Sequence, residues 1–202
     1  MKKVIKAYLQ LEEHVLLMIK AEFFVQLIGA AFFLILNIYL AKQGFSDPEI
    51  ANFISYRFLA VMLLAFPLGF YIKGKPLKPF FILGSLGVPT VAIALVLAIQ
   101  YGLYHYLPAL FILWGVVFTL FQVSSLPYVM RNTSVANQSH AISLNYATHS
   151  FGTILSGIMI FGFGQFMREN DEGVILLFIS TIGFIGLYYL LKMKVDVVMP
   201  IK

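Results

Sequence analysis

The residues of this chain that could exchange protons or bind a charged solute lie within stretches that are otherwise apolar. Five residues of the first stretch recur at steps of four, three, four and four: Glu22, Gln26, Gly29, Phe33 and Asn37. Four residues of the fifth stretch have similar spacing: Asn145, His149, Gly152 and Ser156. In a helix, residues three and four apart share a face. Both stretches are therefore predicted to carry a polar stripe that is turned away from lipid.

Glu22 and His149 are the members of these stripes that can change charge. A carboxylate removed from water can take up and release protons, which would make Glu22 a proton-coupling residue. The alternative is a solvated side chain near the cytoplasmic mouth. A histidine can exchange protons or donate to a solute, and it can equally bond a neighbouring helix. Four amides can orient a solute or hold helices together: Gln26, Asn37, Gln122 and Asn145.

Arg57 lies within the second apolar stretch, about nine residues or roughly 14 Å from its outer end. An arginine in this position costs about 2.5 to 3.5 kcal/mol to insert and is commonly functional. Arg57 is predicted either to bind an anionic solute or to pair structurally with backbone carbonyls, Asn37 or a partner half. Its height differs from that of Glu22 by about 6 to 13 Å, so a direct pair is not expected.

Six apolar stretches are long enough to cross a membrane as helices. Hydrophobic residues make up 60% of the 202 residues and charged residues only 11%, and a helical span needs about 20 apolar residues. We place spans one to six at residues 15–39, 48–72, 79–101, 107–129, 139–166 and 173–191. The predicted fold class is an all-α membrane protein with six transmembrane helices, which occupy a domain at 15–192. A cytoplasmic segment at 1–14 precedes this domain, and a cytoplasmic connector begins at 193–202.

Local signals predict where some spans begin and bend. Ser46 is a helix cap, Pro48 lies in the first turn and Glu49 completes a capping box. Three prolines lie inside spans two, three and four: Pro67, Pro89 and Pro127. They are expected to bend these helices rather than to break them. Four small residues of span five are expected to permit close helix contact: Gly152, Ser156, Gly162 and Gly164.

Basic residues gather at one end of the spans. Ten share this end: Lys2, Lys3, Lys6, Lys73, Lys75, Lys78, Arg131, Lys192, Lys194 and Lys202. The other end has Lys42 and Arg168. Because short basic flanks stay in the cytoplasm, both termini are predicted to be cytoplasmic in an integral protein of the plasma (inner) membrane. Topology and anionic lipid account for the net charge of +5, and no nucleic-acid partner is needed.

The distribution of polar residues predicts which spans face inward. Spans one, two, four and five contain polar side chains and are expected to surround a polar centre. Spans three and six are almost wholly apolar and are expected to lie outside them as lipid-facing support. The order of the spans repeats as three plus three.

Six helices with cytoplasmic ends, built as two three-helix repeats, resemble the amino-terminal half of a major facilitator superfamily transporter. Residues 37–50 resemble the family's first outward turn into its second helix, and residues 139–152 resemble the entrance to its fifth helix. Residues 67–78 occupy the loop between helices two and three, where the family has a glycine-then-basic motif. The resemblance covers essentially the whole chain.

The loop motif matches the family in part. Gly69 matches the opening glycine and Lys78 the final basic position. Lys73 stands where an aspartate is usual, and Pro76 and Leu77 replace the later glycine and arginine. The resemblance implies that this loop latches alternating conformations through four residues: Gly69, Lys73, Lys75 and Lys78.

The resemblance also implies a function. A transporter of this family binds a small solute between two six-helix halves, which rock to expose the site to each side in turn. The chain is therefore predicted to be one half of a secondary-active transporter, and Glu22 is the candidate residue for coupling it to protons. Its partners would be a small-molecule solute, membrane lipid and a second half, supplied by the same parent chain or by a second copy in a homodimer.

Other classes of protein fit the sequence less well. An enzyme would need a catalytic constellation such as His-Glu-x-x-His or Gly-x-Ser-x-Gly, and the sequence contains neither. The absence of cysteine excludes thiolate metal sites, and no metal site or cofactor is predicted. A non-transporting membrane subunit or scaffold that uses the same stripes to seat a partner remains the alternative.

Overall fold

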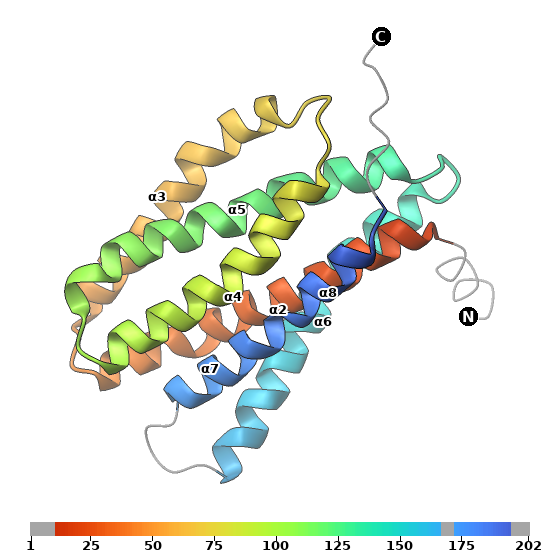
Figure 1. Cartoon of the computed structure of the whole chain (residues 1–202). Helices are drawn as coiled ribbons and strands as arrows, with labels where there is room; N and C mark the ends of the chain where they lie inside the picture. The colour runs from red at the N-terminus through yellow and green to blue at the C-terminus, as the bar shows by residue number, and fades with distance from the viewer. Residues whose placement is uncertain (1–10, 167–171, 195–202) are drawn as a thin grey trace.

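The structure is a computed structural model that describes residues 11–166 and 172–194 (Figure 1). Its helices are α2 (Glu13–Lys42), α3 (Asp47–Tyr71), α4 (Lys78–Gln100), η1 (Tyr104–Tyr106), α5 (Leu107–Asn132), α6 (Gln138–Phe166), α7 (Glu172–Gly183) and α8 (Ile185–Lys192). Six helical segments are long and apolar enough to cross a membrane, the last being α7 with α8, and no strand occurs among the described residues. The chain is an all-α integral membrane protein, and each helix begins and ends within a few residues of its predicted span.

Parts of the predicted termini and one basic flank lie outside the described residues. Residues 1–10 of the amino-terminal segment and 195–202 of the connector are not described. Five of the basic residues used to predict the orientation of the chain in the membrane also lie outside the described ranges: Lys2, Lys3, Lys6, Arg168 and Lys202.

The local signals in the sequence act as predicted. The Glu49 carboxylate accepts hydrogen bonds of 2.8 Å from the backbone N–H of Ser46 and 2.7 Å from its hydroxyl, which fixes the start of α3. Helices α3, α4 and α5 each continue through their internal prolines: Pro67, Pro89 and Pro127. The prediction that these prolines do not break the helices is confirmed.

The sixth span is interrupted, which the sequence did not predict. Helix α7 ends at Gly183 and α8 begins at Ile185, with the N–H of Phe184 bonded to the carbonyl of Thr181 in a tighter turn. A Cβ atom at Gly183 would overlap Cδ1 of Ile28 on α2 and lie 3.1 Å from its Cγ1. The interruption therefore lies where the sixth span presses against the first.

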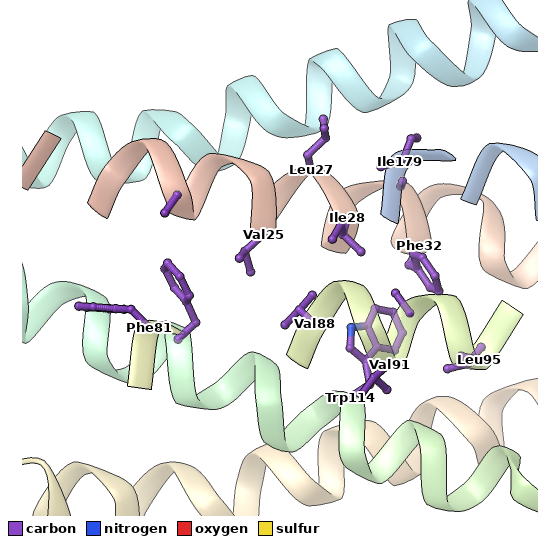
Figure 2. Packing of buried hydrophobic residues seen from close by; sticks show 14 of the residues in the cluster. Val25, Leu27, Ile28, Phe32, Phe81, Val88, Val91, Leu95, Trp114 and Ile179 are labelled. Atoms are coloured by element: carbon purple, nitrogen blue, oxygen red, sulfur yellow. The ribbon is translucent and has the colours of Figure 1, made fainter. Parts of the chain in front are cut away.

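The hydrophobic core lies between α2, α4, α5 and α7. Figure 2 shows side chains from these helices filling the space between them, among them Ile28, Phe32 and Trp114. The rings of Phe32 and Trp114 meet edge to face with centres 4.8 Å apart. Helix α2 packs against α6, α7 and α8, while α5 packs against α3 and α4 (Figure 1). Helix α4 also contacts α7, α8 and α2, so it occupies a central place.

The burial of the spans differs from the prediction that spans three and six lie outermost. The most apolar part of α4 is 56% buried, whereas the corresponding parts of α3 and α6 are only 11% buried. The prediction for span three is wrong because the interior of a helical bundle is as apolar as lipid. A span without polar residues can therefore occupy either environment, and α4 occupies the interior.

The two ends of the bundle are held by different contacts. At one end, the guanidinium of Arg131 donates hydrogen bonds of 3.0 and 3.2 Å to the carbonyls of Lys75 and Ile72, which ties α5 to the α3–α4 loop. At the other end, Nζ of Lys42 lies 2.5 Å from the carboxylate of Glu172 and joins α2 to α7. Successive spans therefore run in alternating directions (Figure 1).

Candidate functional site

A buried carboxylate joins three membrane-spanning helices, α2, α5 and α6. The Glu22 side chain is only 1% exposed, and its Oε2 atom accepts a 2.7 Å hydrogen bond from the hydroxyl of Ser125. Nε2 of His149 lies 3.4 Å from the other carboxylate oxygen, Oε1. The carboxylate is thus held by a hydroxyl of α5 and an imidazole of α6.

Two amides complete this group. The Ser125 hydroxyl also lies 3.2 Å from Oδ1 of Asn145, and Nε2 of Gln26 lies 3.3 Å from Nε2 of His149. We call these five residues the Glu22 cluster: Glu22, Gln26, Ser125, Asn145 and His149. The structure thus brings Glu22 and Gln26 of the α2 stripe together with Asn145 and His149 of the α6 stripe, and α5 adds a hydroxyl to them.

Small residues allow α6 to approach α2 at the cluster. Ser156 donates a 2.9 Å hydrogen bond to a backbone carbonyl of α2, and a Cβ atom at Gly152 would lie 3.5 Å from Cβ of Gln26. The close helix contact predicted for these two positions is confirmed. Gly162 and Gly164 have no other part of the described chain within 4 Å of such an atom, so the same prediction is wrong for them. They lie beyond the point where α6 leaves α2.

The Glu22 cluster has the geometry to hold and pass a proton. The Glu22 carboxylate is shut off from solvent, while the His149 side chain is 37% exposed. The imidazole therefore lies between the carboxylate and the surface of the six-helix unit. A carboxylate and an imidazole can both accept a proton, and here the two groups lie 3.4 Å apart.

Arg57 lies in a separate cavity of about 90 Å³ between α2, α3 and α5. We call this the Arg57 pocket, and its lining residues are Phe32, Phe33, Leu36, Asn37, Ile54, Arg57, Phe58, Phe111 and Trp114. The guanidinium carbon is 4.2 Å from the ring centre of Trp114, 5.1 Å from that of Phe118 and 5.5 Å from that of Phe58. All three distances fall within the range of cation–π attraction, about 6 Å.

The Arg57 guanidinium has no counter-ion in the described part of the chain. No carboxylate of residues 11–166 or 172–194 lies within 4 Å of it, and its Nε atom is buried without a hydrogen-bond partner. Asn37 lines the same cavity, but the structural pairing of Asn37 with Arg57 is not formed. As expected, Glu22 and Arg57 do not form a direct pair.

The two sites are well separated along α2. Residues 32–37 of the Arg57 pocket are ten to fifteen positions beyond Glu22, or about 15 to 22 Å at the helical rise. The predicted single polar centre is therefore two sites. Gln122 lies between them, because it follows Phe118 by four residues and precedes Ser125 by three on α5. Gln122 forms no hydrogen bond with the described residues.

The residues predicted to form a conformational loop lie at the end of the bundle that Arg131 stabilises. Gly69 and Lys73 line a cavity of about 450 Å³ between α3 and α5, together with Arg131. Nζ of Lys75 lies 3.1 Å from the ring centre of Tyr71. Nζ of Lys78 donates a hydrogen bond to the carbonyl of Met193, so this lysine ties α4 to the end of α8.

Three residues of these sites were not predicted from the sequence to be site residues: Ser125, Trp114 and Phe118. Ser125 is one of two adjacent serines in span four, and nothing in their spacing says which one faces Glu22. Trp114 is the only tryptophan of the chain. The weak signal for Phe118 and Trp114 is their spacing of four residues, which places both on one face of α5.

Within residues 11–166 and 172–194, no group of three or more histidine, aspartate or glutamate side chains is arranged to hold a metal ion. Comparison of the chain with protein-family models, with curated proteins and with solved structures finds no match.

Proposed function

We propose that this chain is a six-helix half of a secondary-active transporter that couples solute movement to protons at the Glu22 cluster. The observation that carries the proposal is the 3.4 Å contact between the buried Glu22 carboxylate and the partly exposed His149 imidazole inside membrane-spanning helices. Ionisable side chains in a membrane are costly to insert and usually serve ion or solute pathways. A structural role alone could be filled by neutral amides.

The packing of the helices supports an organisation in two three-helix repeats. Helix α2 packs against α6 and the α7–α8 pair, and α5 packs against α3 and α4. If spans one, two and three correspond to spans four, five and six, then α2 corresponds to α5, α3 to α6, and α4 to the α7–α8 pair. The neighbours of α2 then correspond to the neighbours of α5. Two repeats related in this way are the arrangement expected in a transporter half.

The distribution of charge supports cytoplasmic termini. Basic side chains at the Arg131 end of the bundle include Lys73, Lys75 and Lys78, whereas Lys42 marks the opposite end and is neutralised by Glu172. This asymmetry favours the Arg131 end as the cytoplasmic one in a plasma (inner) membrane. The α3–α4 loop would then be the cytoplasmic latch.

The proposal places the transported solute against a face formed by α2, α3, α5 and α6. Arg57 and Asn37 would contact the solute in one pocket, while Gln26, Gln122, Asn145 and His149 line the path toward Glu22. A second six-helix unit, from the same polypeptide or from a second copy, would close this face. The low burial of α3 and α6 supports such a partner, since both helices leave most of their surface uncovered.

Proteoliposomes that contain a trapped pH indicator test the proton coupling. A panel of small organic anions is added outside, and the entry of protons with the solute is followed. Glu22→Gln keeps the shape of the side chain but cannot exchange a proton, so it should lose solute-driven proton entry while retaining exchange of labelled for unlabelled solute. Glu13→Gln is the matched control, because Glu13 is an exposed carboxylate at the start of the same helix.

Two results would contradict the proposal. Solute-driven proton entry through Glu22→Gln at the wild-type rate would remove Glu22 from the coupling path. The absence of saturable flux for every solute, from protein shown to be folded and inserted, would instead favour a membrane subunit or scaffold.

A further inference from the structure

We propose that the Arg57 pocket binds the carboxylate of an amphipathic monocarboxylate, an organic acid with one negative charge and an apolar tail. The inference names the solute class for the transporter proposed above and rests on that function for the identity of the cargo. The binding step itself needs no transport. It is carried by the unpaired donors, the aromatic walls and the size of this one cavity.

Two residues that line this pocket each have a buried hydrogen-bond donor that lacks an acceptor. Nε of Arg57 and Nε1 of Trp114 are both buried without a partner in the structure, and both residues line the cavity. A buried donor without a partner is costly, and an unpaired buried charge is more so. Two N–H donors beside a positive charge are the complement of a carboxylate, which only accepts hydrogen bonds. Asn37 adds an amide to the same wall.

The aromatic contacts leave the binding edge of the guanidinium available. Cation–π attraction to Trp114 and Phe118 uses the positive charge of Arg57 without using its N–H groups as carboxylate partners. Those N–H groups lie in the guanidinium plane, in a fork that matches the two oxygens of a carboxylate. The rings thus stabilise the charge in an apolar membrane interior while the fork stays unoccupied.

The size and walls of the pocket favour an organic acid over an inorganic anion. A cavity of about 90 Å³ is smaller than a cavity of about 150 Å³ that holds benzene, so it suits a carboxylate and its first carbons. Apart from Arg57, Asn37 and the indole of Trp114, the side chains that line the pocket are hydrocarbon. Hydrocarbon side chains make favourable contacts with an apolar tail, but they cannot supply the hydrogen bonds that phosphate makes with water. The ring of Phe33 is 78% exposed and that of Phe58 58% exposed, so both can cover a tail that leaves the pocket.

The single tryptophan allows ligand binding to the Arg57 pocket to be measured without a transport assay. Trp114 is the only tryptophan of the chain and lies 4.2 Å from the guanidinium, so an anion bound to Arg57 changes the surroundings of the indole directly. The protein in detergent is titrated with hexanoate while tryptophan emission is followed. Hexanol, hexylammonium, chloride and phosphate are titrated in parallel. Palmitate mixed into the micelles tests the same carboxylate chemistry supplied from the membrane.

We expect saturable change with hexanoate and none with hexanol, hexylammonium, chloride or phosphate. Arg57→Gln should weaken hexanoate binding about tenfold or more, because it removes a charge-assisted bidentate contact, and Arg57→Lys should weaken it less. Lys20→Gln is the matched control. It too removes a cation that faces an aromatic ring within a span, here Tyr189 at 5.7 Å, and it should bind hexanoate like the wild type. Saturation by palmitate with no response to hexanoate would assign the carboxylate to a membrane lipid.

Several results would overturn the inference: no saturable change with either carboxylate, equal responses to hexanoate and hexanol, equal responses to hexanoate and chloride, or unchanged affinity in folded Arg57→Gln. If Arg57→Gln does not fold, the comparison of hexanoate with hexanol and hexylammonium in the wild type still decides the question. Glu22→Gln separates this inference from the proposed function, because it should bind hexanoate normally. Hexanoate binding without any flux would refute transport alone, and proton-coupled flux without carboxylate binding would refute this inference alone.

Discussion

A methyl group added at Gly115 tests the geometry of the Arg57 pocket from outside it. Gly115 of α5 lies directly against the backbone of α3 at Arg57. A Cβ atom there would overlap the carbonyl oxygen of Arg57 and lie 2.9 Å from Cβ of Ala60. A backbone oxygen cannot rotate out of the way, so Gly115→Ala must push α3 and α5 apart.

The cost follows from the size of that displacement. Carbon atoms rest about 3.5 Å apart or more, so the contact with Ala60 alone requires a shift of at least about 0.6 Å. Overpacking of this kind commonly costs about 1 to 3 kcal/mol, while replacing glycine by alanine within a helix returns up to about 1 kcal/mol. With the full propensity gain subtracted, Gly115→Ala should therefore destabilise the protein by up to about 2 kcal/mol. It should also weaken hexanoate binding, because it displaces the backbone of Arg57.

Gly157→Ala is the matched control, because a Cβ at Gly157 in α6 meets no atom of the described chain within 4 Å. This variant gains the same helix propensity without the clash, so the two variants should differ by the overpacking cost alone, about 1 to 3 kcal/mol. A chain of this size shifts its unfolding midpoint by about 2 to 4 °C per kcal/mol. Thermal unfolding followed by circular dichroism in detergent should therefore separate the two midpoints by about 2 to 12 °C. Equal midpoints would mean that α3 and α5 do not meet at Gly115 and would contradict the geometry of the Arg57 pocket.

Two further predictions concern hydrogen bonds. Ser125→Ala should lower the free energy of unfolding by about 1.5 to 3 kcal/mol, because the Glu22 carboxylate loses its donor. Ser124→Ala should be neutral or stabilising, because the Ser124 hydroxyl is buried without a partner. Equal effects of the two variants in denaturant titrations would contradict this. Partial burial of Glu12 raises the pKa of its carboxyl, but hydrogen bonds led by the Ser134 backbone N–H outweigh it and hold the pKa below 4.5. A carboxyl whose pKa is lowered in the folded state stabilises the fold at higher pH. The wild type should therefore have a larger free energy of unfolding than Glu12→Gln near neutral pH, and this difference should disappear as the pH falls below 4.5. A difference that does not change with pH would exclude this role of Glu12.

The spans were predictable because their signals are local. Composition and length define each helix, and the Ser46–Glu49 capping box involves residues three apart, so no knowledge of the fold is needed. The interruption at Gly183 has no such signal. The helix is interrupted where Gly183 contacts Ile28, a residue more than 150 positions earlier in the chain. A contact between residues so far apart in the sequence cannot be predicted from local patterns.

The site was predictable in part for a similar reason. Spacing alone puts Glu22 and Gln26 on one face of α2, and Asn145 and His149 on one face of α6. Which faces meet depends on the packing of whole helices. The sequence therefore could not tell that Ser125 completes the cluster, or that Arg57 lies apart from it in a pocket of its own.

The Ser125 hydroxyl has a single hydrogen and two acceptors, the Glu22 carboxylate on one side and the Asn145 amide oxygen on the other. While Glu22 is ionised, that hydrogen is drawn to the stronger acceptor at 2.7 Å. Once Glu22 binds a proton, its own O–H can donate to the serine oxygen, and the serine hydrogen is released toward Asn145. Protonation of Glu22 on α2 would therefore strengthen the hydrogen bond between Ser125 on α5 and Asn145 on α6. A change of charge on one helix would thus alter how two other helices are bonded, without any side chain moving to a new position.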